Sequence, residues 1–200
     1  MNELKKRRIK VVLKYTWPFY IVTALIVGFL LSFIFGITHK IPSYKTLTFF
    51  ISGEVTDVNK LRDDTLEKFK DKELKSFSCI SARPDEGIVY TRKLTIAGYQ
   101  SADVLVIPSS ILKTFRPEPF ALEIDDNLYN SYYQGFTKYI DEGATYGIEI
   151  DPEKVKQYFT LPDETCYMFL NGASKNIGEY SIEQIKEHDN ALSVLQDWGK

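Results

Sequence analysis

The sequence contains few cysteines and few histidines, and each shortage excludes a class of protein. Two cysteines in 200 residues cannot support a disulfide-dense scaffold. Two histidines occur without a Ser/His/Asp, Cys/His, H-E-x-x-H or C-x-x-C pattern around them, so no catalytic or metal-binding constellation is recognisable. A net charge of -2 argues against a nucleic-acid partner. We therefore expect no catalytic residue, no metal and no cofactor.

Apolar and charged residues are both abundant but unevenly distributed. Hydrophobic residues make up 44% of the chain and charged residues 26%, which excludes a disordered protein. Residues 1–14 hold six basic side chains and one acidic side chain. The next 24 residues, from Tyr15 to Thr38, carry no charge. As a helix they would extend about 36 Å, enough to cross a hydrocarbon layer of about 30 Å.

The flanks of this apolar run indicate how it is placed in a membrane. Tyr15, Trp17 and Tyr20 lie at the basic end, where aromatic rings favour the bilayer interface, and Pro18 is expected in the first turn of the helix. The basic residues should stay in the cytoplasm, so the remainder of the chain should be extracytoplasmic. A cleaved signal peptide is the alternative, but its apolar region normally spans about 7–15 residues and ends at small residues. We expect an uncleaved anchor.

The chain then divides into four predicted parts. These are a cytoplasmic basic segment (1–14), a transmembrane helix (15–38), a linker (39–44) and an extracytoplasmic domain (45–200). Within the domain, apolar runs alternate with helical spacing, which predicts one α/β domain with a mainly parallel or mixed sheet flanked by helices. Strands are expected at 46–52, 74–82, 103–107, 146–150 and 165–170. Helices are expected at 55–69, 127–140, after 151 and at 181–198, with a short helix within 89–101 closed by Gly98.

Three of these predictions depend on particular residues. The run before Pro108 is continuously apolar, as in a strand buried on both faces, so 103–107 should be a central strand together with 166–170. Gly143 should end the helix at 127–140. Ser181 and Gln184 resemble a capping box that starts the last helix, whose apolar residues should face inward. These residues are Ile182, Ile185, Leu192, Leu195 and Trp198.

Several stretches of the domain together resemble a known family. TLTFFISGE leads into a long helix and is followed by AGYQSADVLVIPSSIL, YGIEI and YMFLNGASKN. This order, from Thr46 to about Trp198, resembles the extracellular solute-binding proteins of ABC transporters. The resemblance implies an α/β fold with strand ends that approach a ligand cleft. Such proteins have two lobes, whereas the predicted domain of about 155 residues has room for one. They also commonly carry a lipid-anchor cysteine, which this chain replaces with a membrane helix.

The residues at the predicted strand ends are the candidates for ligand binding. In an open α/β sheet, ligands lie beyond the carboxyl ends of the strands. This rule nominates Ser52, Gly53, Glu54, Ser109, Ser110, Asn171, Ser174 and Asn176. The alternative is that these residues serve as ordinary helix caps and turns. Cys79 and Cys166 lie in two predicted strands, and they form either a disulfide, if those strands are neighbours, or two separately buried thiols.

The tyrosines of the predicted helix at 127–140 could serve a second kind of binding. Tyr129, Tyr132, Tyr133 and Tyr139 follow helical spacing, which is typical of a packing face. Alternatively, Tyr129 and Tyr133 form a partner-binding surface, since tyrosine is enriched at interfaces.

The sequence thus predicts a single-pass membrane protein, and not an enzyme, that presents a non-catalytic binding domain outside the cytoplasm. It would be an accessory subunit of a bacterial envelope or transporter complex, with the lipid bilayer and another membrane protein as partners. The alternative is a membrane-anchored small-molecule sensor or solute-binding module. A deep polar pocket uniting Ser52, Ser109 and Asn171 would favour the sensor, and a flat aromatic patch would favour the subunit.

Overall fold

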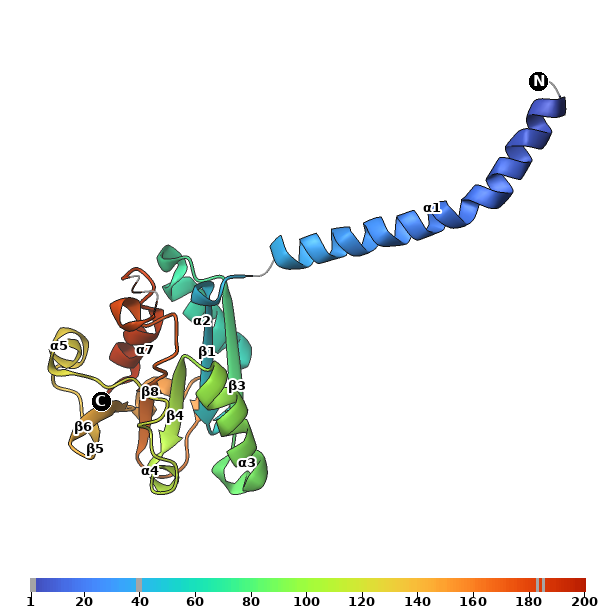
Figure 1. Cartoon of the computed structure of the whole chain (residues 1–200). Coiled ribbons are helices and arrows are strands. Elements are labelled where there is room, and N and C mark those ends of the chain that lie inside the picture. The colour runs from blue at the N-terminus through green and yellow to red at the C-terminus, as the bar shows by residue number, and fades with distance from the viewer. Residues whose placement is uncertain (1–2, 39–40, 183, 185) are drawn as a thin grey trace. The chain divides into compact units, whose positions relative to one another are not determined.

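The computed structural model describes residues 3–38, 41–182, 184 and 186–200 of the chain. These fall into two compact units, Met1–Lys40 and Ile41–Lys200 (Figure 1). The first unit is a single helix, α1 (Glu3–Thr38). By length and composition, its part Lys14–Gly36 could cross a membrane. The predicted cytoplasmic segment and the predicted transmembrane segment therefore belong to one continuous helix.

Pro18 does not lie in the first turn of this helix, as the sequence suggested, but inside it. The helix begins at Glu3, so the basic residues before Tyr15 are part of it. A proline at this position leaves the carbonyl of Lys14 without its helical donor, and an internal proline bends a helix. Figure 1 shows that α1 is bent.

The second unit is built on a six-stranded mixed sheet with the order β3-β1-β4-β8-β6-β5. The strands are β1 (Thr46–Ser52), β3 (Ser76–Ala82), β4 (Val104–Pro108), β5 (Lys138–Asp141), β6 (Ala144–Glu149) and β8 (Cys166–Leu170). β3, β1 and β4 are parallel, and β8, β6 and β5 continue the sheet with antiparallel pairings. The predicted mixed α/β fold is confirmed, and β4 and β8 are its central strands. A second, two-stranded sheet that was not predicted pairs β2 (Glu54–Val55) with β7 (Phe159–Thr160).

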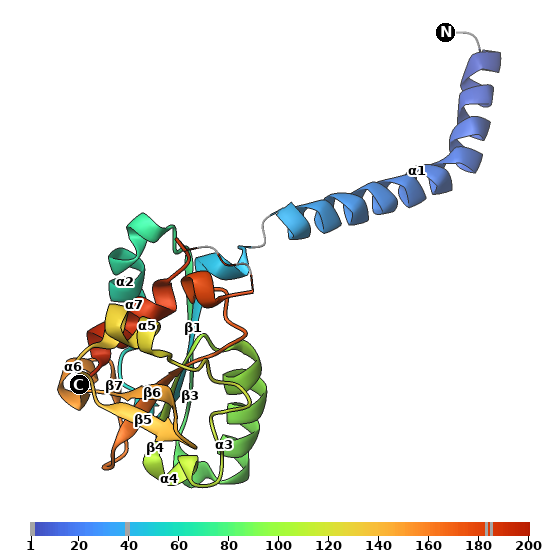
Figure 2. The same cartoon turned by 60° about the vertical axis from the view of Figure 1, so that its left-hand side comes forward.

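Helices cover both faces of the six-stranded sheet (Figure 2). They are α2 (Val58–Lys68), α3 (Ile88–Lys93), the π-helix η4 (Leu94–Tyr99), α4 (Ser109–Leu112), α5 (Asp126–Leu128), the π-helix η5 (Tyr129–Tyr133), α6 (Pro152–Val155) and α7 (Asn190–Trp198). Short 3-10 turns are η1 (Ser43–Lys45), η2 (Lys70–Lys72), η3 (Pro84–Glu86) and η6 (Gly178–Tyr180). α2, α5, η5 and α7 share one core, and α3, η4 and α4 contribute to the other. α2 and α7, which correspond to the helices expected at 55–69 and 181–198, therefore lie on the same face of the sheet.

The alternation of side chains along β1 explains the two cores. Phe49 and Ile51 point to the face of α2 and α7, whereas Phe50 points to the face of α3. β4 is buried along its whole length because helices pack on both sides of it. The continuous apolar run before Pro108 was therefore correctly interpreted as a central strand.

The predicted helix at 127–140 is wrong in its second half. Helical backbone ends at Tyr133, and β5 begins at Lys138. Gly143 does not end a helix but turns the hairpin between β5 and β6. Glu142 and Gly143 have φ of 49° and 90°, the conformation of a tight primed turn.

The helix predicted to begin at Ser181 begins at Asn190 instead. Half of the predicted capping box forms, because the Ser181 hydroxyl accepts the backbone N–H of Gln184 at 3.1 Å. Gln184, however, has a φ of +50°, which does not continue into a helix. Ile182 is 89% exposed and not inward-facing, and Ile185 lies outside the described residues. Leu192 and Leu195 are buried as predicted.

Candidate functional site

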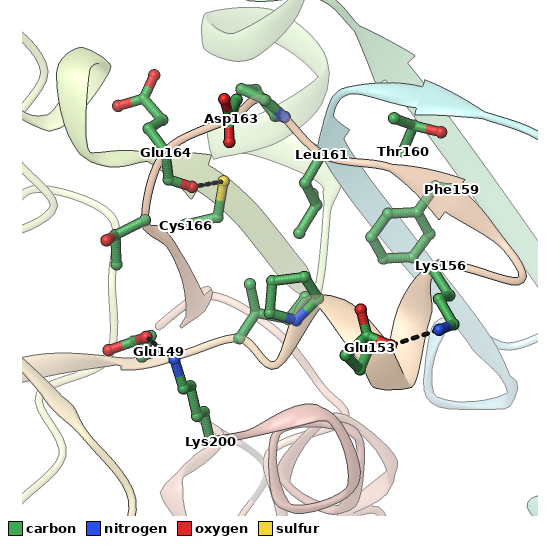
Figure 3. Close-up of a pocket in the computed structure, with 14 residues that line it drawn as sticks. Glu149, Glu153, Lys156, Phe159, Thr160, Leu161, Asp163, Glu164, Cys166 and Lys200 are labelled. Atoms are coloured by element: carbon green, nitrogen blue, oxygen red, sulfur yellow. Dashed lines mark hydrogen bonds and ion pairs between the residues drawn. The ribbon is translucent and has the colours of Figure 1, made fainter.

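Three adjoining hollows line the edge of the sheet at which the parallel strands end. The first has a volume of about 470 Å³ and lies between β6, α6 and the segment that leads into β8 (Figure 3). The second, of about 290 Å³, shares residues 160–162 with the first. The third, of about 380 Å³, shares residues 53–54 and Arg83 with the second. We call these three adjoining hollows together the strand-end groove.

The first hollow combines carboxylates, lysines and apolar side chains. The Lys200 ammonium lies 3.3 Å from a Glu149 carboxylate oxygen, and Lys156 pairs with Glu153. Figure 3 shows Leu161 pointing towards the middle of the hollow. Leu161 also lines the second hollow, so it joins the two. The ammonium groups of Lys200 and Lys156 are therefore already paired with carboxylates. The apolar side chains of the hollow lie beside these pairs and are available for contact with a ligand or partner.

Ser109 and Ser110 lie at this edge as predicted, but their hydroxyls are occupied. Both hydroxyls donate to the Glu164 carboxylate at 2.7 Å, and so does the backbone N–H of Ser110. Partial burial raises the pKa of Glu164, but the hydrogen bonds from Ser110 and Ser109 outweigh it and leave this pKa below its usual value. Glu164 therefore caps the start of α4, whereas Ser109 and Ser110 are the first residues of this helix and not its caps.

The residues after β1 differ in what they offer to the groove. Ser52 is fully buried, and its hydroxyl is 2.7 Å from the Tyr90 hydroxyl. Gly53 is required for close packing, because a Cβ there would lie 2.4 Å from the backbone oxygen of Thr160. Glu54 is exposed and lines the second and third hollows. Of the three predicted residues, only Glu54 presents a side chain to the groove.

Asn171, Ser174 and Asn176 lie at the opposite edge of the sheet. β8 is antiparallel to β4, so the carboxyl end of β8 meets the beginning of β4. The polar pocket at Ser52, Ser109 and Asn171 that would have favoured a sensor does not form, because these residues lie at two different edges of the sheet. Whether any of the eight nominated residues binds a ligand remains a prediction.

At that opposite edge, the three residues hold the chain together around Asp103. Its carboxylate accepts the Ser174 hydroxyl at 2.5 Å, the Asn176 side-chain N–H at 3.2 Å and the Thr48 backbone N–H at 2.7 Å. Burial raises the pKa of Asp103, and these bonds oppose the rise. The side-chain N–H groups of Asn171 donate to the backbone oxygens of residues 99 and 102. These amides and hydroxyls are therefore used in internal contacts.

The two tyrosines predicted for a partner surface are placed differently from expectation. Tyr133 is fully buried, and its hydroxyl donates to the backbone oxygen of Leu192 at 3.2 Å. A surface role for Tyr133 is therefore wrong, because η5 turns this ring into the core beneath α7. Tyr129 is half-buried, and the Lys138 ammonium lies 3.5 Å from its ring centre.

The two cysteines are separate thiols, of which Cys166 lines the first hollow, and His188 lies away from the groove. Cys79 and Cys166 are free thiols in β3 and β8, and β1 and β4 lie between these strands. Burial raises the pKa of each thiol to about 12, which keeps both protonated. The interpretation as two separate thiols is confirmed. His188 stacks on Tyr44, next to the start of β1, with ring centres 4.0 Å apart.

The strand-end groove contains residues that the sequence did not single out. Leu161, Glu164 and Lys200 lie outside the motifs considered, and Lys200 joins the site from the end of the chain. The turn at 162–164 was the available signal, since connecting loops on a rigid scaffold often carry binding residues. No group of three or more metal-ligating side chains is found among the described residues.

No protein-family model matches the chain, and no curated protein matches it. Among solved structures, it is similar to the maltose/maltodextrin-binding domain MalE from Bdellovibrio bacteriovorus bound to maltotriose, with 16% identity and a TM-score of 0.39. It is also similar to the ABC substrate-binding protein Lmo0181 from Listeria monocytogenes in complex with cycloalternan, with 10% identity and a TM-score of 0.34. These matches cover 52% and 56% of this chain. The chain spans 28% and 32% of the length of those proteins.

Proposed function

We propose that this chain is a single-pass membrane protein that presents a non-catalytic binding domain outside the cytoplasm. It acts as an accessory subunit of a bacterial envelope or transporter complex, and the strand-end groove holds a segment of a partner membrane protein. The observation that carries this proposal is the continuity of the groove. Three hollows that share residues suit an extended chain better than one compact solute.

The membrane anchor in this proposal is α1. Its part Lys14–Gly36 is long and apolar enough to cross a bilayer, and the basic residues before it favour the cytoplasmic side. Anchoring confines the domain and its partner to one surface, which raises the effective concentration of each for the other.

The groove lies at the edge of the sheet opposite the point at which the chain enters the domain. The chain enters the domain at the start of β1, and the groove lies at the other end of this seven-residue strand. At about 3.3 Å per residue, the two ends are roughly 23 Å apart. The linker therefore attaches at one edge of the sheet, and the binding surface is at the opposite edge.

The local chemistry favours binding over catalysis. The hydroxyls of Ser109 and Ser110 are bonded to Glu164, and the Ser52 hydroxyl is bonded to Tyr90. His188, which could act as a base, stacks on Tyr44 at the edge where the chain enters. A nucleophile and a base must lie within hydrogen-bond distance to cooperate, and His188 lies at the edge opposite these hydroxyls.

Leu161→Asp tests the proposed function, because Leu161 joins two hollows. Its melting temperature is measured alongside, since Leu161 also packs against the core. Membrane proteins that co-purify with the wild-type chain in mild detergent should be recovered at least about tenfold less with the variant, since a carboxylate would be buried in an apolar contact. Quantitative mass spectrometry measures the recovery. Ile140→Asp, on an exposed residue of β5, is the matched control. Equal recovery with Leu161→Asp and wild type would contradict the proposal.

A small-molecule sensor is the second candidate, and the volume of the first hollow favours it. About 470 Å³ falls within the range of about 300–1,000 Å³ that is usual for small-molecule sites. Under this alternative, a polar solute should raise the melting temperature of the wild-type chain but not that of Lys200→Ala. A screen of polar solutes by thermal shift distinguishes the two candidates.

A further inference from the structure

β3 is an edge strand whose own residues carry none of the usual protective features. Its seven residues, SFSCISA, contain no charge and no proline, and its register with β1 is continuous without a bulge. Figure 1 shows β3 at the margin of the sheet. Natural proteins normally protect such edges with charges, prolines, bulges or very short strands, because unpaired backbone groups recruit further strands. A bare edge of this length indicates that another strand covers it.

The pairing with β1 shows which backbone groups of β3 do not bond to β1. Ala82 accepts the N–H of Gly53, and the N–H and C=O of Thr48 bond to Asp103 on the β4 side. Alternate residues of a strand direct their backbone groups to opposite sides. Ser76, Ser78, Ile80 and Ala82 therefore bond to β1. The N–H and C=O groups of Phe77, Cys79 and Ser81 point outwards.

These outward groups are symmetric about Cys79, which suits an antiparallel copy of the same strand. Pairing Cys79 with Cys79 places Phe77 opposite Ser81 in both directions. Each of these three residue pairs can form two hydrogen bonds, so two copies would satisfy all the outward groups. No like charges would face each other within the strand.

An exposed apolar stripe runs beside the same edge. The Lys93 ammonium lies 3.4 Å from the outward carbonyl oxygen of Ser81, so this face of α3 borders the edge. Val89 and Ile96 lie four residues before and three residues after Lys93, and such residues share a helix face. Each of the two side chains is 52% exposed. A second copy would bring the same stripe to the junction and cover this apolar area.

We propose that the chain forms a twofold-symmetric dimer in which β3 pairs antiparallel with β3 of a second copy about Cys79. The pairing joins two six-stranded sheets into one continuous sheet. The paired edge borders the third hollow of the strand-end groove, which Ser81, Arg83 and Lys93 also line. The dimer is tested by self-association of the chain and not by recovery of a partner, so its failure is distinguishable from failure of the proposed function.

Substitution at Ser78 tests the dimer, because this side chain is exposed and its backbone bonds to β1 and not to the second copy. A lysine at this position places like charges diagonally across the axis, about 7–8 Å apart. Ser78→Lys should weaken the self-association of the full chain in mild detergent at least about tenfold, measured by light scattering during gel filtration. Ser131→Lys, on an exposed serine of η5, should leave the dimer unchanged.

A cross-link locates the contact in the wild-type strand geometry. Ser78→Cys should be joined to a second copy by a bismaleimide that spans about 8 Å. The wild-type chain is the blank, because both of its thiols are protonated and at least partly buried. Two results would overturn the proposal: a wild-type chain that is monomeric at the highest concentration measured, or a dimer that persists in Ser78→Lys. A Ser78→Cys cross-link to a different protein would assign the edge to that protein and also overturn it.

Discussion

At the scale of single residues, the neighbours of a polar side chain decide its role. Ser109 and Ser110 satisfy both criteria of a ligand site, since they follow a buried strand and carry hydroxyls. In the structure the Glu164 carboxylate takes both hydroxyls. Nothing local to residues 109–110 indicates that a carboxylate 54 residues further along the chain will lie beside Ser110.

The capping role of Glu164 predicts a pH-dependent stability. In the folded chain the pKa of Glu164 lies below its usual value, so its stabilising contribution is present above the unfolded pKa, about 4.3, and is lost as pH falls through the folded pKa. At pH 7, Glu164→Gln should lower the free energy of unfolding by about 1 kcal/mol. The difference from wild type should shrink below about pH 4. Urea unfolding at both pH values measures it.

The exposed neighbour Asp163 supplies the control for this experiment. Asp163→Asn should unfold like wild type at neutral pH. A Glu164→Gln chain whose stability difference from wild type is the same at pH 7 and at pH 3 would show that the carboxylate does not act through its charge.

At the scale of elements, patterns dominated by burial were interpreted correctly, and ambiguous ones were not. β4 is apolar throughout because helices cover both its faces, and this pattern has one simple interpretation. The aromatic residues of 127–140 fit a helix face up to Tyr133. Beyond it, Tyr139 and Ile140 alternate across the strand β5, and two residues alone cannot distinguish the two spacings.

The central position of β4 predicts a large effect of Val106→Asp. Val106 is 1% exposed, and the described structure provides no cation beside it, so a carboxylate there would be buried without a partner. The free energy of unfolding should fall by about 4 kcal/mol or more. Chemical denaturation of the full chain in detergent measures this loss. Ile140→Asp, at a residue that is 60% exposed, should cost little. A cooperative transition of normal midpoint in Val106→Asp would disprove the assignment of the core.

At the scale of the whole molecule, the basic residues at the start of α1 predict the topology of the chain in the membrane. If the basic end of α1 is cytoplasmic, the domain after residue 42 is exposed at the outer surface. Protease added outside intact cells or spheroplasts should digest the domain, while a tag fused before Met1 should remain protected. Immunoblotting against the tag and the domain measures both. Finding the mature protein free in the medium, with its sequence beginning near Lys40, would instead indicate a cleaved signal peptide.

The sequence alone determined what depends on local pattern. The length and lack of charge at 15–38 predict a helix able to cross a membrane, because hydrocarbon thickness sets a fixed number of residues. Apolar runs of strand length that alternate with helical spacing predict an α/β domain, because each element must bury one face or both. Both predictions agree with the structure at this level.

Only the tertiary structure decided which residues meet. Strand direction leaves no mark on the side-chain period, so the sequence could not show that β8 runs against β4. Because β8 is antiparallel to β4, Asn171 lies at the edge opposite Ser109, and the two residues cannot line one pocket. The strand-end groove likewise joins segments around Gly53, Arg83 and Leu161, which are distant in sequence and adjacent only because the sheet folds them together. Local pattern determines the elements, and long-range packing determines the site.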